Sequence, residues 1–100
     1  MSFYMTGFGE EASVISSTAS LKDNDLVFPQ YREQGCFLWR GFTLKQMAHQ
    51  LAGTHLDGTK GRQMPVHYGS DELNIVQVSS PLGTQIPNAS GAGYHYRIKD

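Results

Sequence analysis

Polar stretches at two points of this sequence combine residue types that could bind a ligand or an ion. The first, residues 79–87, reads Ser-Ser-Pro-Leu-Gly-Thr-Gln-Ile-Pro and carries hydroxyl, amide and carbonyl oxygens. Each proline stiffens the backbone and removes an N–H donor while leaving its carbonyl oxygen free. A rigid loop rich in oxygen atoms suits a hard cation or a polar cofactor. The residues alone favour a different explanation, an ordinary strand-to-helix turn with a serine cap.

The second stretch, residues 30–33, places a tyrosine beside an arginine where an extended segment gives way to a helix. The guanidinium of Arg32 can bind a phosphate bidentately, and the hydroxyl of Tyr31 can add another hydrogen bond. The alternative is a surface arginine beside a half-buried tyrosine. The residues alone favour this alternative, because most arginines are exposed.

Other titratable residues give weaker signals. Glu10 and Glu11 could form a catalytic carboxylate pair, but adjacent residues on a helix do not face each other. His55, Asp57 and His67 could bind a metal, but their spacing fits no familiar zinc pattern. His67 could instead titrate near neutral pH and face a site.

The loop at 79–87 lies between two expected elements. Apolar residues alternate over 75–78, which predicts a strand. The small-residue run 89–94 predicts a tightly packed helix. In open α/β sheets, ligands bind at the carboxyl ends of strands, which is where this loop would lie.

A further helix is predicted near the start of the chain. Glu10 and Glu11 suit a first helical turn, where the helix dipole favours negative charge. Ala12, Ile15 and Ala19 recur at helical spacing, so this face is expected to pack inward.

Residues 43–53 carry the end signals of another helix. Thr43 and Gln46 form a capping box, and Gly53 is the expected stop. The apolar stripe expected to face the core consists of Leu44, Met47, Ala48 and Leu51. His49 falls outside this stripe and is expected to face solvent.

Composition bounds the class of protein. One hundred residues allow one domain, and a net charge of −1 makes nucleic acid a poor candidate partner. No apolar run reaches the length of a membrane helix, and residues 1–6 lack the features of a signal or transit peptide. Cys36 is the single cysteine, which excludes an internal disulfide and favours a reduced, intracellular setting. Its apolar neighbours predict a core position.

Taken in order, these motifs resemble the alpha subunits of thiamine-diphosphate-dependent 2-oxo acid dehydrogenases, most closely the branched-chain type. The residues that carry the resemblance are 2–6, 9–11, 25–28, 30–33, 61–69, 79–82 and 84–87. The form Gln-Met-Pro-Val-His-Tyr at 63–68 is typical of the branched-chain enzymes, whereas pyruvate and acetoin relatives carry a Gly-Gly-Ser-Met-His type of sequence there.

The resemblance implies an α/β fold, with residues 1–100 forming part of a thiamine-diphosphate-binding domain built on a parallel sheet flanked by helices. It implies oxidative decarboxylation of branched-chain 2-oxo acids with acyl transfer to a lipoyl group. The thiamine cofactor carries that chemistry, while the protein binds and orients it. Family members in eukaryotes work in the mitochondrial matrix.

The resemblance also implies a set of binding residues. Tyr31 and Arg32 match the pair that holds the diphosphate of the cofactor, and Ser80 matches a cofactor-contacting serine. Leu82 matches a residue beside the aminopyrimidine. Potassium-binding residues of the family correspond to Ser79, Pro81, Thr84 and Gln85. No catalytic residue of the family corresponds to a position in this chain.

The implied partners are a beta subunit, in an alpha2-beta2 heterotetramer, and a lipoyl-bearing acyltransferase. The magnesium segment of the family and its later catalytic histidines are expected after residue 100, so the chain is expected to be a fragment and inactive alone. Such a piece of a parallel sheet would leave apolar faces uncovered. The alternatives are the alpha subunit of a pyruvate or acetoin dehydrogenase, and a non-catalytic chain that keeps an anion site or a surface for the beta subunit.

Overall fold

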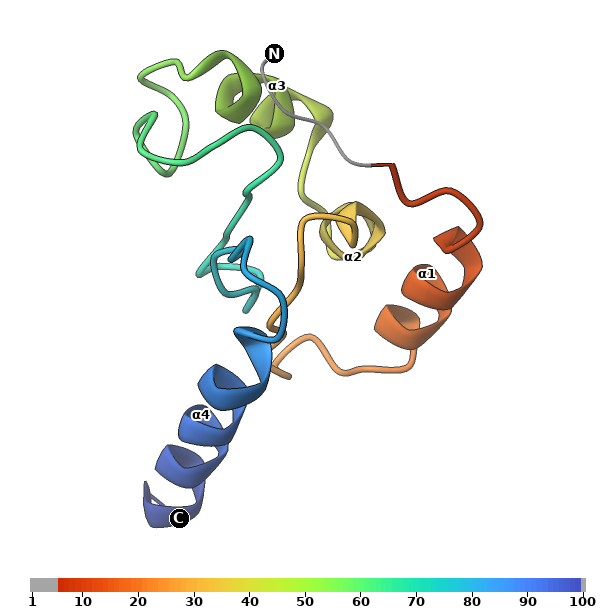
Figure 1. Cartoon of the computed structure of the whole chain (residues 1–100), viewed down its shortest axis with the longest axis vertical. Coiled ribbons are helices and arrows are strands. Elements are labelled where there is room, and N and C mark those ends of the chain that lie inside the picture. The colour runs from red at the N-terminus through yellow and green to blue at the C-terminus, as the bar shows by residue number, and fades with distance from the viewer. Residues whose placement is uncertain (1–5, 100) are drawn as a thin grey trace.

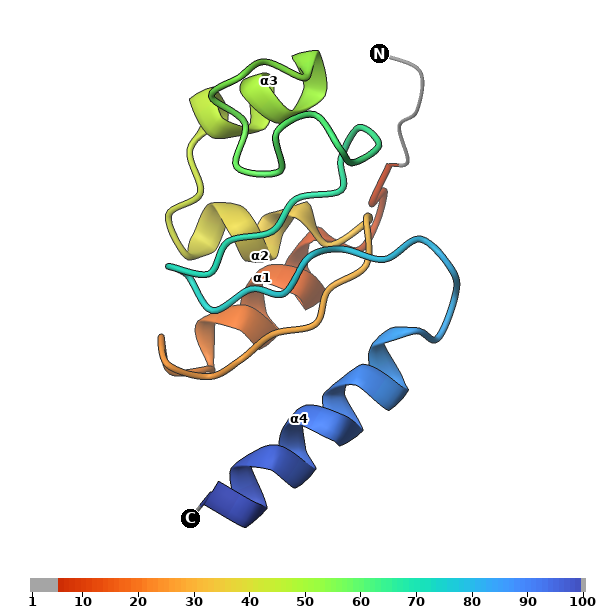
Figure 2. The same cartoon turned by 90° about the vertical axis from the view of Figure 1, so that its left-hand side faces the viewer.

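In the computed structural model, which describes residues 6–99, four helices are joined by irregular segments of very different length (Figure 1). They are α1 (Glu11–Ala19), α2 (Gln34–Trp39), α3 (Leu44–Ala52) and α4 (Gln85–Lys99). Helix α1 packs against α2, whereas α4 projects away from the other helices in both views (Figures 1 and 2). Two predictions fall largely outside the described residues. They are the resemblance at residues 2–6 and the expectation that residues 1–6 are not a signal or transit peptide. No helix within 6–99 is long and apolar enough to cross a bilayer.

The core lies between α2, α3 and the segment that follows α3. The rings of Phe37, Phe42 and Tyr68 pack together with centroids 5.3 to 5.5 Å apart. Ile75 and Val66 are each 1% exposed beside them. Cys36 is 2% exposed, which confirms its predicted core position. Burial raises the pKa of the Cys36 thiol, so the thiol stays protonated at neutral pH.

Helix α1 begins close to the predicted position, with Glu11 in its first turn and Glu10 as the N-cap residue just before it. The prediction for its inward face was wrong at two of three positions, because Ala12 and Ala19 are exposed. The face that packs inward carries Val14, Ile15 and the buried Thr18. Thr18 is tolerated there because its hydroxyl donates to the carbonyl oxygen of Val14 at 2.8 Å within the same helix.

Both ends of α3 are confirmed. Thr43 and Gln46 make the capping box, and Gly53 ends the helix with a left-handed φ of 67°. The stripe was only partly right. Met47 is buried and Leu51 is partly buried, but Leu44 is 74% exposed and Ala48 is exposed.

Two polar residues of α3 turn inward instead. Gln50 is 4% exposed and bonds the backbone at 64–67, where its amide satisfies groups that an apolar side chain would leave unpaired. The prediction that His49 faces solvent was wrong: it is half-buried, and its Nδ1 lies 2.7 Å from Thr54 Oγ1.

Extended backbone, rather than regular strands, connects the described helices. Ile75 makes isolated bridges, parallel to Val27 and antiparallel to Ser70. Single hydrogen bonds continue these pairings from Val76 N to Val27 O (2.8 Å) and from Val78 N to Tyr68 O (2.9 Å). The predicted strand over 75–78 is thus an extended segment that pairs on both sides through isolated bridges and single hydrogen bonds, without forming a regular strand. Three extended segments, 27–30, 67–70 and 75–80, run side by side (Figure 2).

Helix α4 is longer than the predicted helix and differs in packing. It begins at Gln85 and runs through Pro87, which a first helical turn accepts because the missing N–H has no partner there. None of its described residues is buried, so the expected tight packing is not present.

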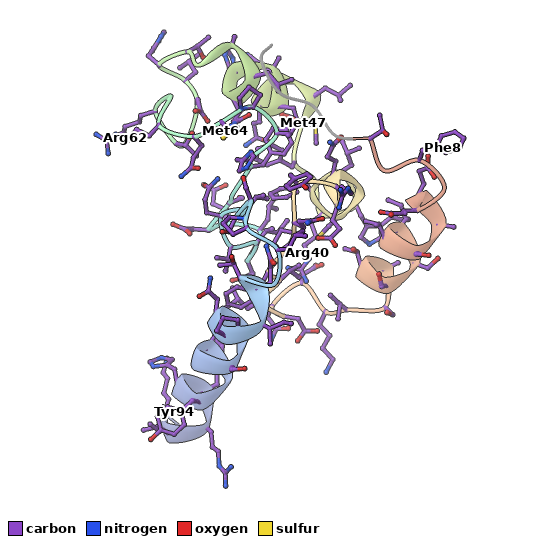
Figure 3. All side chains as sticks on the ribbon, in the orientation of Figure 1. Phe8, Arg40, Met47, Arg62, Met64 and Tyr94 are labelled. Atoms are coloured by element: carbon purple, nitrogen blue, oxygen red, sulfur yellow. The ribbon has the colours of Figure 1, made fainter. Side chains whose placement is uncertain are left out.

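Arg40, at the end of α2 and near the centre of the molecule, forms hydrogen bonds to two turns that are far apart in sequence (Figure 3). Its guanidinium donates to the carbonyl oxygens of Asp25 and Leu73, each at 2.8 Å, and of Lys22 at 3.0 Å. These bonds fix the turn before Val27 against the turn before Ile75. They therefore support the parallel pairing of the segments that carry the site.

Candidate functional site

The three extended segments bring Tyr31, His67 and Ser80 to one end of the molecule. Segments 27–30 and 75–80 run parallel from the Val27–Ile75 bridge, so their carboxyl ends lie together, and Tyr31 directly follows the first of them. Segment 67–70 runs antiparallel to segment 75–80. Side chains at the carboxyl ends of paired parallel segments converge, which is the arrangement of ligand sites in α/β proteins.

The turn before α2 presents Tyr31 and Arg32. Glu33 N donates to Gln30 O at 3.1 Å, and the Glu33 carboxylate accepts a hydrogen bond from Gln30 N. This local closure sets both side chains at half-buried positions. The guanidinium carbon of Arg32 lies 5.1 Å from the Tyr31 ring centroid, a cation–π contact that restrains the arginine.

Arg32 keeps an unneutralised charge. Its guanidinium donates to Gln30 Oε1 at 3.2 Å, and no carboxylate within residues 6–99 forms a salt bridge with it. It lines a cavity of about 270 Å³ that is also lined by Glu10 and Glu11. A guanidinium with free donors and no paired carboxylate suits an anion.

Ser80 meets His67 across the segments. Ser80 Oγ is hydrogen-bonded to Nε2 of His67, and the His67 ring stacks on Tyr31 with centroids 6.0 Å apart. A continuous set of contacts thus joins Arg32, Tyr31, His67 and Ser80. His67, which was expected to face a site, lies among these candidate residues, and its role there stays a prediction.

The loop after Ser80 gathers oxygen atoms. Thr84 Oγ1 donates to the carbonyl oxygen of Pro81 at 2.8 Å. Gln85 Nε2 donates to the carbonyl oxygens of Ser79 at 3.1 Å and of Pro29 at 3.2 Å. The second contact anchors the loop to the segment that leads into Tyr31. All four residues predicted to bind an ion therefore lie in one hydrogen-bonded loop.

Comparison with known proteins identifies the family. The model of the family described as "Dehydrogenase E1 component" matches residues 1–100. The chain belongs to the dehydrogenase E1 component family. This E1 chain is 54% identical over 98 residues to 2-oxoisovalerate dehydrogenase subunit alpha 1, mitochondrial, of Arabidopsis thaliana, covering 98% of the chain and 21% of that protein.

Relatives in animals and amoebae are similar to the E1 chain to the same degree. Identity is 53% over 94 residues to the mitochondrial alpha subunit of 2-oxoisovalerate dehydrogenase of Bos taurus, with 94% of the chain and 21% of the relative covered. It is 50% over 98 residues to the subunit of Dictyostelium discoideum, with 98% and 22% covered. The chain spans about a fifth of the length of these relatives.

The last predicted cofactor residue of the E1 chain, Leu82, differs from the polar cluster around His67 because its side chain is apolar and exposed. It is 77% exposed in the turn that precedes α4, and Gly83 beside it has a left-handed φ of 81°. The turn therefore presents an apolar side chain outward, where a ligand or a neighbouring chain could cover it.

The alternative sites are not assembled. His55 is exposed, while the ring nitrogens of His67 lie against Pro65 and Ser80. Within residues 6–99, no three His, Cys, Asp or Glu side chains are placed to hold a metal ion. Glu10 and Glu11 are exposed at the start of α1.

Sequence reasoning considered Asp57 only as a metal ligand and missed that its buried carboxylate orders the loop before Met64. It accepts hydrogen bonds from Thr59 N at 3.1 Å, Gly61 N at 3.0 Å and the Thr59 hydroxyl. Burial alone would raise the pKa of Asp57, but these hydrogen bonds outweigh it and lower the pKa. An Asp two residues before a Thr in a Gly-rich loop is the signal that could have indicated this turn.

Proposed function

We propose that the protein carrying this chain oxidatively decarboxylates branched-chain 2-oxo acids with thiamine diphosphate and passes the acyl group to a lipoyl group. The observation that carries the proposal is the convergence of Arg32, Tyr31 and Ser80 in a chain of the E1 family. The 2-oxoisovalerate dehydrogenase names of the relatives support the branched-chain substrate.

The residues fit thiamine diphosphate at both of its ends. The unneutralised guanidinium of Arg32 and the hydroxyl of Tyr31 would hold the diphosphate through charge-assisted hydrogen bonds. Ser80 and the exposed Leu82 would contact the aminopyrimidine end. When bound, the cofactor would supply the nucleophilic carbon and the electron sink that decarboxylation of a 2-oxo acid requires. The chain's own residues bind and orient it.

The loop fits potassium. Ser79 and Pro81 offer carbonyl oxygens, Thr84 a hydroxyl oxygen and Gln85 an amide oxygen. Thr84 and Gln85 already hold these carbonyls in place. Carbonyl and hydroxyl oxygens without a carboxylate suit a large monovalent cation. Such an ion would stiffen the loop between Ser80 and α4. The magnesium ion of the site would take its ligands from outside these residues.

The whole protein would be the alpha subunit of a mitochondrial alpha2-beta2 assembly that serves a lipoyl-bearing acyltransferase. In it, the paired extended segments would belong to a parallel sheet flanked by helices, an α/β fold. The exposed Leu82, Ile86 and Tyr94 would be covered by the remainder of that assembly. The chain of residues 1–100 alone would not turn over substrate.

Turnover by the whole protein, purified with its partner subunit, tests this proposal. We expect reduction of an artificial electron acceptor with 3-methyl-2-oxobutanoate, which is 2-oxoisovalerate, and only when thiamine diphosphate is added. Pyruvate should be the poorer substrate. Equal activity without thiamine diphosphate would contradict the proposed chemistry, and a preference for pyruvate would contradict the proposed substrate.

A further inference from the structure

His67 lies buried where the three extended segments meet and is not among the proposed cofactor contacts. Its side chain is 3% exposed. Its ring stacks on Tyr31, with the ring planes inclined by 26°, and its Nε2 is hydrogen-bonded to Ser80 Oγ. One ring therefore contacts a residue of the proposed diphosphate end and a residue of the proposed aminopyrimidine end.

The surroundings of His67 determine which ring nitrogen carries the proton. Nδ1 lies 2.9 Å from the carbonyl oxygen of Pro65, which can only accept, so Nδ1 must be the donor. In a neutral imidazole, Nε2 is then the acceptor, and the hydroxyl of Ser80 must donate to it. The proton of Ser80 is thereby committed to His67. The oxygen of Ser80 can offer a ligand only its lone pairs.

The backbone next to His67 is held in a strained conformation by hydrogen bonds from buried amide side chains. Val66 has a φ of 63°, a left-handed conformation that a β-branched residue rarely adopts. Gln50 fixes it by accepting from Val66 N at 3.1 Å and donating to Met64 O at 2.6 Å. Gln77 donates to the carbonyl oxygen of His67. A strained backbone held by buried amides is typical of a functional position.

We propose that His67 is a positioning residue of the cofactor site, which turns Ser80 into a pure hydrogen-bond acceptor. This role rests on the proposed function, in which the ligand is thiamine diphosphate. The diphosphate of that ligand carries acceptors at neutral pH, whereas the amino group of its aminopyrimidine carries N–H donors. An acceptor-only Ser80 therefore recognises the amino group and not the diphosphate.

Matched substitutions of His67 in the whole protein, assembled with its partner subunit, test this role. His67→Asn keeps a donor for Pro65 but ends short of Ser80. His67→Gln places an amide oxygen near the position of Nε2, where it can accept from Ser80. The affinities for thiamine diphosphate and for inorganic diphosphate, which lacks the amino group, are measured by calorimetry.

We expect His67→Asn to weaken thiamine diphosphate binding about tenfold, the effect of one lost hydrogen bond, and to leave diphosphate affinity within about twofold. His67→Gln should recover most of the loss. Combining His67→Asn with Ser80→Ala should weaken binding no further than Ser80→Ala alone, because His67 acts through Ser80. A merely structural role would weaken both ligands equally.

Wild-type affinity in His67→Asn, equal losses for both ligands, or additive effects with Ser80→Ala would overturn the role of His67. If His67→Asn does not assemble with the partner subunit, His67→Gln is compared with Ser80→Ala instead. The role of His67 requires His67→Gln to bind thiamine diphosphate more tightly than Ser80→Ala, and equal affinities would overturn it. A wild-type protein that binds no thiamine diphosphate would overturn the proposed function together with this role. Normal binding in every His67 variant would overturn the role alone.

Discussion

At the scale of single residues, the site depends on how a few polar groups are paired. Arg32 has donors to spare and no paired carboxylate within residues 6–99, whereas Asp57 is buried with its oxygens bonded to Thr59 and Gly61. The first arrangement leaves charge available for a ligand. The second uses charge to order a loop. These different pairings give the two residues different expected responses to mutation.

Arg32→Ala should weaken thiamine diphosphate binding by the whole protein by about 10- to 100-fold, because the diphosphate loses charge-assisted hydrogen bonds of about 1.5–3 kcal/mol. Calorimetric titration measures the loss. Arg62→Ala is the matched control, since Arg62 is exposed and points away from the site (Figure 3). Equal losses in both variants would point to bulk charge and remove Arg32 from the site.

Asp57→Ala should lower the free energy of unfolding by about 1–3 kcal/mol at neutral pH, because three donors lose a buried acceptor. Folding lowers the pKa of Asp57 below the 3.8 of a free side chain. The stabilisation is therefore fully present above that pH and is lost as the pH falls through the lowered value. Urea unfolding should thus show the gap between wild type and variant closing in acid. A constant gap would contradict this role for the charge.

At the scale of elements, short segments are fixed by long-range polar contacts. Capping chemistry predicted α3 from sequence because Thr43, Gln46 and Gly53 act locally. The inward faces of α1 and α3 were less predictable, because each buries a polar side chain. Thr18 is buried with its hydroxyl bonded to the backbone of its own helix, and Gln50 is buried with its amide bonded to the backbone at Met64. The binding residues were predicted by resemblance, whereas their convergence required the pairing of Val27 with Ile75.

Arg40→Ala should lower the thermal stability of the whole protein, by about 2–4 kcal/mol in unfolding free energy. Carbonyls of Asp25, Leu73 and Lys22 lose their shared donor, and their turns lose the link between them. Lys45→Ala, at an exposed position of α3, is the control and should change stability by less than about 0.5 kcal/mol. Similar melting temperatures for both variants would show that Arg40 does not hold these turns.

Thr84→Val should reduce thermal stability more in potassium than in a buffer without potassium. The substitution keeps the side-chain volume but removes the hydroxyl that donates to Pro81 and would contact the ion. Binding to the folded state alone stabilises it, so loss of the ion site removes the stabilisation that potassium adds. Equal losses in both buffers would argue against an ion at this loop.

At the scale of the whole molecule, helix α4 presents apolar side chains that no other part of residues 6–99 buries. Helix α4 buries none of its described residues and exposes Ile86, Tyr94 and Ile98 by 65% or more. The chain spans about a fifth of the length of its E1 relatives. The proposed assembly accounts for both facts, since the remaining subunit and its partner would supply the missing contacts and complete the sheet.

A density map of the whole protein with thiamine diphosphate and potassium bound is the most direct test of the central claim. We predict diphosphate density against the guanidinium of Arg32 and the hydroxyl of Tyr31, and aminopyrimidine density beside Ser80 and Leu82. The potassium ion should lie within the loop formed by Ser79, Pro81, Thr84 and Gln85. Cofactor density elsewhere, with Arg32 and Ser80 facing away from it, would contradict the account.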